Sequence, residues 1–494
     1  MAVINEGIVV FQKSMNKILN YINGELVAPK STNYLDNIEP ATGTVYSQIP
    51  DSESEDIEAA VVAAKNAQHG WATMAVETRS AYLMKIADLI DRDIEELARA
   101  ESIDNGKPIS LARSVDIPRA SANFRFYAAA IINFSTAAHI TPDKGVNYTV
   151  RQPVGIAGCI SPWNLPLYLF TWKIAPALAT GNCVVAKPSE ITPMTAFLLS
   201  RICIEAGLPA GVLNIIHGLG PKVGEAIVSH KDIPAISFTG GTATGARIAT
   251  ITAPMFKKLS LELGGKNPNI IFNDCDFDEV LSTTLKSSFS NQGQICLCGS
   301  RIYVQKDIYN RFLDAFVEKV KKMQVADPLD ENTKTGAIVS ESHMQKVLSY
   351  IELAKEEGGK IETGGYQVEL AGRCANGFFI QPTIISGLDA SCRTNQEEIF
   401  GPVVTIQPFS TEEEVIGLAN STNYGLSATI WTENLKRAHR AAASLKSGIV
   451  WVNCWLVRDL RTPFGGMKQS GVGREGGDDA LNFFTEAKNI CIKV

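Results

Sequence analysis

Hydrophobic residues recur along this chain at two different spacings, and the spacing changes from one segment to the next. Short apolar runs broken by Asn-Gly and Pro-Ala-Thr-Gly turns predict short strands that form an N-terminal hairpin over residues 21–49. Apolar positions three and four residues apart then predict a run of helices, the last of which Pro118 must kink or restart. These helices are expected at 55–67, 76–93, 94–104 and 110–132.

A regular alternation of strands and helices follows. The short apolar runs at 154–160, 183–188, 212–218, 235–240 and 258–263 are separated by helical segments. This order is typical of an open parallel sheet with right-handed crossovers. Ligands of such sheets bind at the carboxyl ends of the strands, and each of these runs ends in a distinctive turn. We therefore predict a Rossmann-type domain.

A second alternating region predicts a further α/β domain. Its expected helices are 277–290, 307–323, 340–357, 412–420 and 435–447, and its expected strands are 301–305, 379–385, 403–408, 427–431 and 449–452. The predicted division is a cofactor domain of residues 1–132 and 153–260, a catalytic domain of residues 261–455, and a small β arm of residues 133–152 and 480–494. A terminal strand at 489–494 would be an aggregation-prone edge if unpaired. We expect it to pair with the arm at 137–152 across a subunit boundary, in a homodimer or homotetramer.

The composition of this 494-residue chain disfavours several classes of binding partner. Its net charge of −6 without long runs of one sign argues against a nucleic-acid or polybasic membrane surface. No apolar run approaches the roughly 18 residues that a membrane span needs. Ten cysteines without CxxC pairs and six histidines favour reduced thiols in a cytoplasmic protein with no metal site. Residues 1–20 are a weak candidate for a targeting peptide and are expected to form a partly ordered extension.

The candidate chemistry centres on Cys296, which follows a small, polar, glycine-broken turn at residues 287–295. A nucleophilic thiol needs an approachable sulfur and nearby amide donors, and such a turn supplies both. Asn164, in a Pro-Trp-Asn turn, and Glu262, in the segment LELGGK, could supply an amide donor and a base. Each has an ordinary alternative: a reduced core cysteine, a turn asparagine and a carboxylate that caps a glycine turn.

The three segments together resemble the aldehyde dehydrogenase family. Its F-x-N-x-G-Q-x-C pattern is present as Phe289, Asn291, Gly293, Gln294 and Cys296, and the similarity extends from the turn at 40–43 to the end of the chain. The resemblance implies that Cys296 attacks an aldehyde, that Asn164 and the Cys296 N–H hold the oxyanion, and that Glu262 activates water. Family members that transfer the acyl group to coenzyme A generally lack this base, so hydrolysis is expected. Cys298 is interpreted as a second thiol open to oxidation.

The resemblance also implies an NAD site. Glycines before two predicted helices, at 218–224 and 239–245, offer free amides to a pyrophosphate, although the family usually has serine where this chain has Gly241. Glu190 after the second strand favours NAD over NADP because a carboxylate repels a 2′-phosphate, and Lys187 offsets part of that repulsion. A simple ion pair of these two residues is the alternative. The expected cofactor residues are Ile160, Ser161, Pro162, Trp163, Lys187, Ser189, Glu190, Gly220, Gly224, Phe238, Thr239, Gly240, Gly241, Leu263, Glu398 and Phe400.

A closer resemblance concerns the substrate. Residues 116–128, 161–182 and 455–477 are similar to family members that oxidise 2-aminomuconate or 2-hydroxymuconate 6-semialdehyde in aromatic or tryptophan catabolism. Such substrates carry a carboxylate, for which arginine is the natural receiver. Arg119 and Arg461 are the expected receivers, Arg458 and Arg125 are treated as decoys, and the aromatic side chains of Tyr168, Trp172 and Trp455 are expected to line the pocket.

Three other functions fit parts of the pattern. A dehydrogenase for retinal-like or betaine-type aldehydes would use the same nucleophile and base. A thiol esterase could use Cys296, Asn164 and Glu262 without a cofactor, so NAD binding separates it from the dehydrogenases. An inactive binding protein on this scaffold would be labelled at its thiol without turning over substrate.

Overall fold

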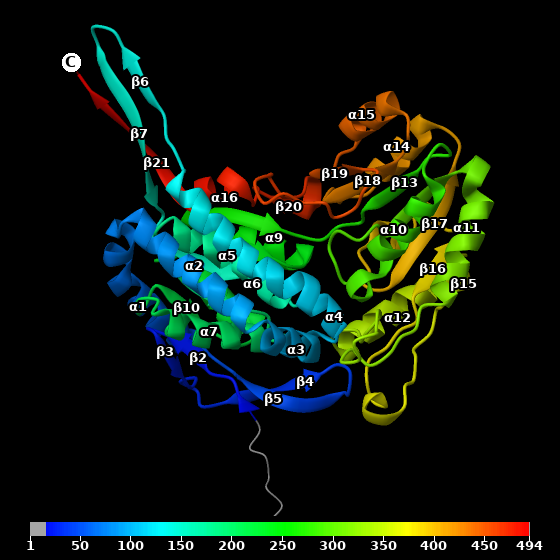
Figure 1. The fold of residues 1–494 in the computed structure, drawn as a ribbon, viewed down its shortest axis with the longest axis horizontal. Coiled ribbons are helices and arrows are strands. Elements are labelled where there is room, and N and C mark those ends of the chain that lie inside the picture. Colours follow the sequence, from blue (N-terminus) through cyan, green and yellow to red (C-terminus); the bar gives the residue numbers. More distant parts are fainter. Residues whose placement is uncertain (1–15, 494) are drawn as a thin grey trace, which may run out of the picture.

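The computed structural model describes residues 16–493, so the expected N-terminal extension lies largely outside the described residues. Two α/β halves lie side by side, and a three-stranded arm projects from the first of them (Figure 1). Among the described residues, no helix combines the length and the apolarity that a membrane span requires. This architecture confirms the predicted fold class, whereas the exact domain limits stay a prediction.

An eight-stranded sheet forms the centre of the first half, in the order β20-β12-β11-β8-β9-β10-β2-β3. The five predicted strands lie next to one another and run parallel, and the edge strands β20, β2 and β3 are antiparallel additions. The strands are β2 (Asn20–Ile22), β3 (Glu25–Val27), β8 (Ile156–Ile160), β9 (Cys183–Lys187), β10 (Leu213–Ile215), β11 (Ala235–Thr239), β12 (Lys258–Glu262) and β20 (Gly471–Val472).

The helices of this half pack around the sheet through one continuous apolar core. Their bounds are α1 (Ser54–Thr73), α2 (Val76–Arg92), α3 (Ile94–Asn105), α4 (Ile109–Leu111), α5 (Ile117–Ile132), α6 (Pro166–Ala179), α7 (Met194–Ala206), α8 (Glu225–Ser229), α9 (Thr242–Thr252) and α16 (Gly477–Phe483). A π-helical turn at Ala112–Asp116 precedes α5. Pro118 has no N–H to donate to an earlier carbonyl, so the regular helix restarts there, as predicted.

A seven-stranded sheet organises the second half, in the order β15-β16-β17-β14-β13-β18-β19, with only β15 antiparallel. Its strands are β13 (Pro268–Ile271), β14 (Arg301–Gln305), β15 (Lys360–Thr363), β16 (Thr383–Ser386), β17 (Val403–Phe409), β18 (Ser427–Trp431) and β19 (Ile449–Val452). Its helices are α10 (Phe277–Phe289), α11 (Lys306–Lys321), α12 (Glu341–Glu356), α13 (Arg393–Gln396), α14 (Glu412–Asn420) and α15 (Leu435–Ser444).

Two smaller sheets complete the chain. Near the N-terminus, β4 (Tyr34–Glu39) and β5 (Thr44–Pro50) form the predicted hairpin, to which β1 (Asn16–Lys17) adds in parallel. The arm consists of β6 (Ala138–Thr141), β7 (Gly145–Pro153) and the terminal strand β21 (Thr485–Ile492). The expected pairing of tail and arm is confirmed, but it is made within one chain, because α16 brings the tail back beside β7.

Candidate active site

The turn that carries Cys296 is fixed by unusual backbone conformations. After α10, Asn291 and Gln292 adopt left-handed φ angles of 51° and 55°, and Gly293 follows at 69°. A Cβ atom at Gly293 would lie 2.2 Å from the carbonyl oxygen of Gly401, so only glycine fits there. The thiol of Cys296 is left half-buried at the wall of a cavity.

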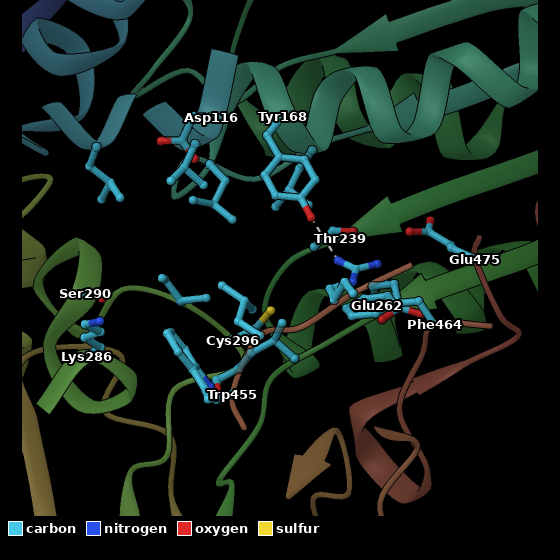
Figure 2. A pocket seen from close by; sticks show the side chains of 18 of the residues that line it. Asp116, Tyr168, Thr239, Glu262, Lys286, Ser290, Cys296, Trp455, Phe464 and Glu475 are labelled. Carbon is cyan, nitrogen blue, oxygen red and sulfur yellow. Dashed lines mark hydrogen bonds between the residues drawn. The ribbon is translucent and has the colours of Figure 1, made fainter. Parts of the chain in front are cut away.

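This cavity has a volume of about 220 Å³ and brings together residues from both halves of the chain. Figure 2 shows Cys296 and Glu262 on its wall with Tyr168 and Trp455. The other predicted residues that line it are Thr239 and Leu263, and its remaining walls include Leu111, Val115, Asp116, Lys286, Ser290, Arg458, Phe464 and Glu475. The indole of Trp455 donates a hydrogen bond to the Leu297 carbonyl across 3.0 Å, which holds the ring in place.

Asn164 is attached to the cysteine turn by hydrogen bonds in both directions. Its side-chain amide donates to the carbonyl of Gln294 across 2.9 Å, and its own carbonyl accepts from the amide of Asn291 across 3.0 Å. Lys107 Nζ donates to the same carbonyl across 3.1 Å. A primary amide has two N–H groups, so Asn164 retains one donor for an oxyanion.

Glu262 is the last residue of β12 and its side chain is buried, with Oε1 lacking a hydrogen-bond partner. Burial holds the pKa of its carboxyl well above the usual range, and the nearby charge of Glu475 raises that pKa further. Glu475 itself is held by Lys173 Nζ at 2.7 Å and by the hydroxyl of Ser237 at 3.1 Å. A raised pKa makes a carboxylate a stronger proton acceptor, which is what a general base requires.

The thiol of Cys296 is protonated at neutral pH in this environment. Burial raises its pKa, and the carboxylates of Glu398 and Glu262 raise the pKa further. Nucleophilic attack by Cys296 therefore requires a group that takes up the thiol proton. Glu262 lines the same cavity and has an unpartnered oxygen, so it meets this requirement.

A second cavity, of about 400 Å³, lies at the carboxyl ends of the parallel strands in the first half. The predicted cofactor residues that line it are Ile160, Glu190, Gly220, Gly224 and Phe238. Glu190 accepts a hydrogen bond from the Gly220 N–H across 3.1 Å and pairs with Lys187 Nζ at 2.8 Å. Although burial alone would raise the pKa of Glu190, Lys187 lowers it, so the carboxylate is charged at the cavity wall.

The loop before α9 fits a pyrophosphate. Gly240 and Gly241 directly precede this helix, and a Cβ atom at Gly241 would meet nothing within 4 Å. The backbone there is open to a ligand, and the helix N-terminus offers it free N–H groups. Three further predicted residues follow β8 and β9 at the carboxyl ends of these strands, namely Ser161, Pro162 and Ser189. They line neither the cavity of Cys296 nor the cavity of Glu190.

A third group of predicted residues surrounds the other side of the cysteine. Glu398 and Phe400 line a small cavity with Cys296 and Cys298. The Gly265 N–H donates to Glu398 Oε1 across 2.7 Å, whereas Glu397 turns outward to Arg393. The rings of Trp163 and Phe400 meet edge to face with centroids 5.3 Å apart.

The arginine that lines the cavity of Cys296 is not one of the two expected from the sequence. Arg458, which was treated as a decoy, lines the cavity with Cys296. The guanidinium of Arg119 lies 5.5 Å from the centre of the Tyr168 ring, and its Nε is buried without a partner. Arg461 does not line the cavity; its side chain is 80% exposed and pairs with Asp459. Arg125 pairs with Asp88 and Asp91 at the surface.

Two points of the expected pocket therefore change. Trp172 is buried beside Tyr127 and lies behind the cavity, where the guanidinium of Arg458 covers its ring at 5.3 Å. The sequence does not show which arginine lines the cavity, because Arg458 and Arg461 lie on either side of Asp459. Only the three-dimensional pairing of Asp459 with Arg461 distinguishes them.

Comparisons with known proteins agree with this geometry. The family model described as "Aldehyde dehydrogenase family" matches residues 26–490. A 2-aminomuconic semialdehyde dehydrogenase of Danio rerio is 53% identical over 477 residues, which cover 96% of this chain and 98% of that protein. A 2-hydroxymuconic semialdehyde dehydrogenase of Pseudomonas sp. (strain CF600) is 46% identical, with 97% and 100% covered.

Solved structures give the same result for the fold. The NAD+ complex of an aldehyde dehydrogenase from Bacillus cereus superposes with a TM-score of 0.94 and 40% identity, covering 97% of each chain. An indole-3-acetaldehyde dehydrogenase complexed with NAD+ gives a TM-score of 0.95 and 38% identity, with 98% of each chain covered. With a family match over most of its length and relatives of this similarity, the chain belongs to the aldehyde dehydrogenase family.

Proposed function

We propose that this protein is an NAD-dependent dehydrogenase that oxidises an acid semialdehyde to the dicarboxylate. The substrate class is 2-aminomuconate or 2-hydroxymuconate 6-semialdehyde, as in the names of the relatives, and the reaction would serve aromatic or tryptophan (kynurenine) catabolism. The observation that carries the proposal is that Cys296, Glu262 and Arg458 line one cavity. These residues supply a nucleophile, a base and a carboxylate receiver.

The reaction begins with attack of the Cys296 sulfur on the aldehyde carbon. The thiol proton passes to Glu262, whose raised pKa suits it for this role. The new C–S bond turns the carbonyl oxygen into an oxyanion, which the free N–H of the Asn164 amide and the Cys296 N–H stabilise. Loss of one such donor typically costs about 2.7–4 kcal/mol of transition-state stabilisation.

Oxidation and hydrolysis follow from the same arrangement. NAD+, when bound, accepts the hydride that leaves the former aldehyde carbon with its electron pair. The oxidised carbon remains on sulfur as a thioester. Glu262 next releases the thiol proton to solvent and then takes a proton from water, so that hydroxide attacks the thioester. The C–S bond breaks, and the carboxylic acid formed gives its proton to the sulfur, which leaves the carboxylate and the free thiol of Cys296.

The residues of the second cavity fit the cofactor. Gly241 leaves open backbone before α9 for the pyrophosphate, and Glu190 presents a carboxylate that would accept hydrogen bonds from ribose hydroxyls. Glu398 would hold the nicotinamide ribose beside Cys296, because both line the third cavity. We therefore propose that the first half of the chain binds the cofactor and that the second half provides the nucleophile Cys296.

The acid end of the substrate would bind Arg458, with Arg119 as a second cation. Arg458 is fixed against the ring of Phe464, with its guanidinium carbon 4.0 Å from the ring centre. A guanidinium held in this way offers two parallel N–H groups to a carboxylate. Arg461 faces solvent and its carboxylate partner is already Asp459, so it takes no part in this proposal.

We further propose a cytoplasmic homodimer or homotetramer that meets only its small-molecule substrate and cofactor. All ten cysteines are free thiols, which suits a reducing compartment. The arm carries exposed apolar side chains such as Ile140, which is 77% exposed, and these favour burial in an oligomer.

The test is NADH formation by the purified protein with 2-hydroxymuconate 6-semialdehyde and with a neutral aldehyde of similar length. Each assay is repeated with NADP, and Cys296→Ser is the control without a thiol. A kcat/KM at least tenfold higher for the acid semialdehyde with NAD supports the proposal. Equal or better turnover of the neutral aldehyde would remove the acid specificity, and ester cleavage without NAD would replace the dehydrogenase by a thiol esterase.

A further inference from the structure

The cavity that holds Cys296 adjoins an outer chamber of about 410 Å³. The two spaces share three lining residues, Leu111, Lys286 and Ser290, so these residues form the neck between them. Figure 2 shows Lys286 and Ser290 together on one side of the inner cavity, at the end of α10. A molecule that moves from the outer chamber toward Cys296 must pass Lys286.

The charged groups of the two spaces differ. The inner cavity has three carboxyls on its wall, those of Asp116, Glu262 and Glu475, and one arginine, Arg458. The outer chamber carries Lys286 and Lys334 and has no acidic lining residue. Among the inner carboxyls, that of Asp116 is paired with Lys107 at 2.5 Å. The neck is therefore the positively charged part of the path.

Neither lysine of the chamber is neutralised by a partner. Both side chains are exposed, and neither forms an ion pair within residues 16–493. The neighbouring Arg113 provides a contrast, because it pairs with Glu95 at 2.8 Å and with Glu331 at 2.7 Å. Uncompensated cations above apolar walls attract an anion more strongly than cations that already have a partner.

The uncharged part of the chamber suits the carbon chain of a semialdehyde. Its walls include Leu285, Phe289 and Met323, and the hydroxyls of Ser110, Ser114 and Thr333 lie among them. An apolar wall with two cations at its rim can hold a carboxylate at one end and an unsaturated chain along its side. Lysine is a hydrated, flexible charge, so it can accompany an anion without fixing it.

We propose that Lys286 and Lys334 form an entrance site that captures anionic aldehydes and delivers them to Cys296. This inference rests on the proposed function, because it assumes that the substrate carries a carboxylate. The lysines raise the local concentration of the anion at the neck, and Arg458 then receives the carboxylate in the inner cavity. The two lysines thus affect the capture of the substrate rather than the chemistry at sulfur.

The test compares Lys286→Met, Lys334→Met and the double variant with wild type. Lys436→Met is the matched control. This lysine on α15 is exposed, and it lines neither the outer chamber nor the two cavities that Cys296 lines. It forms no ion pair in the part of the chain that the structure describes. At low ionic strength, kcat/KM of the double variant for the acid semialdehyde should fall about tenfold with kcat changed less than about twofold. At about 0.5 M salt, where charges are screened over a few ångströms, the loss should nearly vanish.

Three results decide the matter. Unchanged kcat/KM at low salt, a salt-independent loss, or an equal loss for a neutral aldehyde would overturn the entrance site. Lys286→Glu should lower kcat/KM further than Lys286→Met, which a purely steric role would not do. Succinate semialdehyde and butanal serve as a second pair of acid and neutral probes. If wild type preferred neutral aldehydes, the proposed substrate would fail, while the salt-dependent effect of the lysines on succinate semialdehyde would still test the entrance site.

Discussion

Arg458 donates a hydrogen bond to the hydroxyl of Tyr168 across 2.9 Å, and this contact joins the loop after Trp455 to helix α6. The same guanidinium lies against Phe464 at 4.0 Å and Trp172 at 5.3 Å. Three aromatic side chains therefore fix one cation in the wall of the cavity that contains Cys296. A fixed cation loses little freedom when it binds a carboxylate, which favours an acidic substrate.

Replacement of Arg458 by methionine should weaken binding of the acid semialdehyde. A hydrogen bond to a charged group contributes about 1.5–3 kcal/mol, so KM should rise between about tenfold and a hundredfold. KM for a neutral aldehyde should change by less than about threefold, because no charge is recognised there. The measurement is steady-state NADH formation with both substrates.

Arg461→Met is the matched control, in the same loop and with the same loss of charge. Its side chain is exposed and pairs with Asp459, so KM for the acid semialdehyde should stay within about twofold of wild type. The opposite pattern, with a large effect at Arg461 and none at Arg458, would restore the assignment expected from sequence and remove Arg458 from substrate binding.

Replacement of Glu262 by glutamine should slow the attack of Cys296 and, more strongly, the hydrolysis that follows oxidation. The amide cannot take a proton from water, and loss of a general base typically slows its step about 10²–10⁴-fold. We expect slow release of the acid and accumulation of an acyl group on Cys296. Mass spectrometry of the intact protein after mixing with NAD and substrate should detect the added mass of the thioester. Unchanged steady-state turnover would show that Glu262 is not the base.

The pH dependence of hydrolysis should follow the environment of Glu262. Burial and the charge of Glu475 raise the pKa of Glu262, so its carboxyl is neutral at low pH and becomes a base only as pH rises through that raised value. Glu475→Gln removes the negative charge, which should lower this pKa and shift the rising limb of the deacylation rate to lower pH. Lys173→Met removes a cation that favours the charged form, so it should shift the limb the other way.

Single-turnover deacylation measured from pH 5 to 10 distinguishes these effects. Because both variants disturb a buried ion pair, thermal unfolding must first show that each protein is folded. Shifts in the same direction for the two variants would mean that a general loss of structure, and not the charge near Glu262, controls the profile.

Much of the site could be predicted from the sequence because its parts follow local patterns. Glu262 ends an apolar run followed by glycines, and it lies at the end of β12, an outer strand of the five parallel strands. The glycine-broken turn before Cys296 is likewise local, since Gly293 needs a conformation and a close approach that only glycine allows. The five strands of the first sheet share the same signal, namely short apolar runs between helices.

What could not be predicted depends on contacts between distant segments. Arg458 and Tyr168 are 290 residues apart, and no spacing rule selects Arg458 over Arg461. The central strand β13 (Pro268–Ile271) was missed because it has four residues and follows a glycine turn. Glu398 and Glu397 are adjacent, and only the hydrogen bond of the Gly265 N–H to Glu398 identifies the one that faces Cys296.

Glu190 should determine the choice of cofactor. Its carboxylate lines the 400 Å³ cavity, held by Lys187 Nζ at 2.8 Å and by the Gly220 N–H at 3.1 Å. In Glu190→Gln the negative charge is lost, while Lys187 remains to attract a 2′-phosphate. We expect kcat/KM with NADP to rise at least about tenfold and kcat/KM with NAD to fall several-fold, because a ribose hydroxyl loses a charged acceptor.

Glu225→Gln is the control for this change. Glu225 lines the same cavity, but its carboxylate is paired with Arg247 at 2.6 Å, so its loss removes an equal charge from a neutralised pair. This variant should leave the ratio of NAD to NADP activity within about twofold of wild type. Equal shifts of the ratio in both variants would mean that the net charge of the cavity selects the cofactor. A shift confined to Glu190→Gln would identify contact with the ribose as the cause, since only Glu190 is held by the glycine loop.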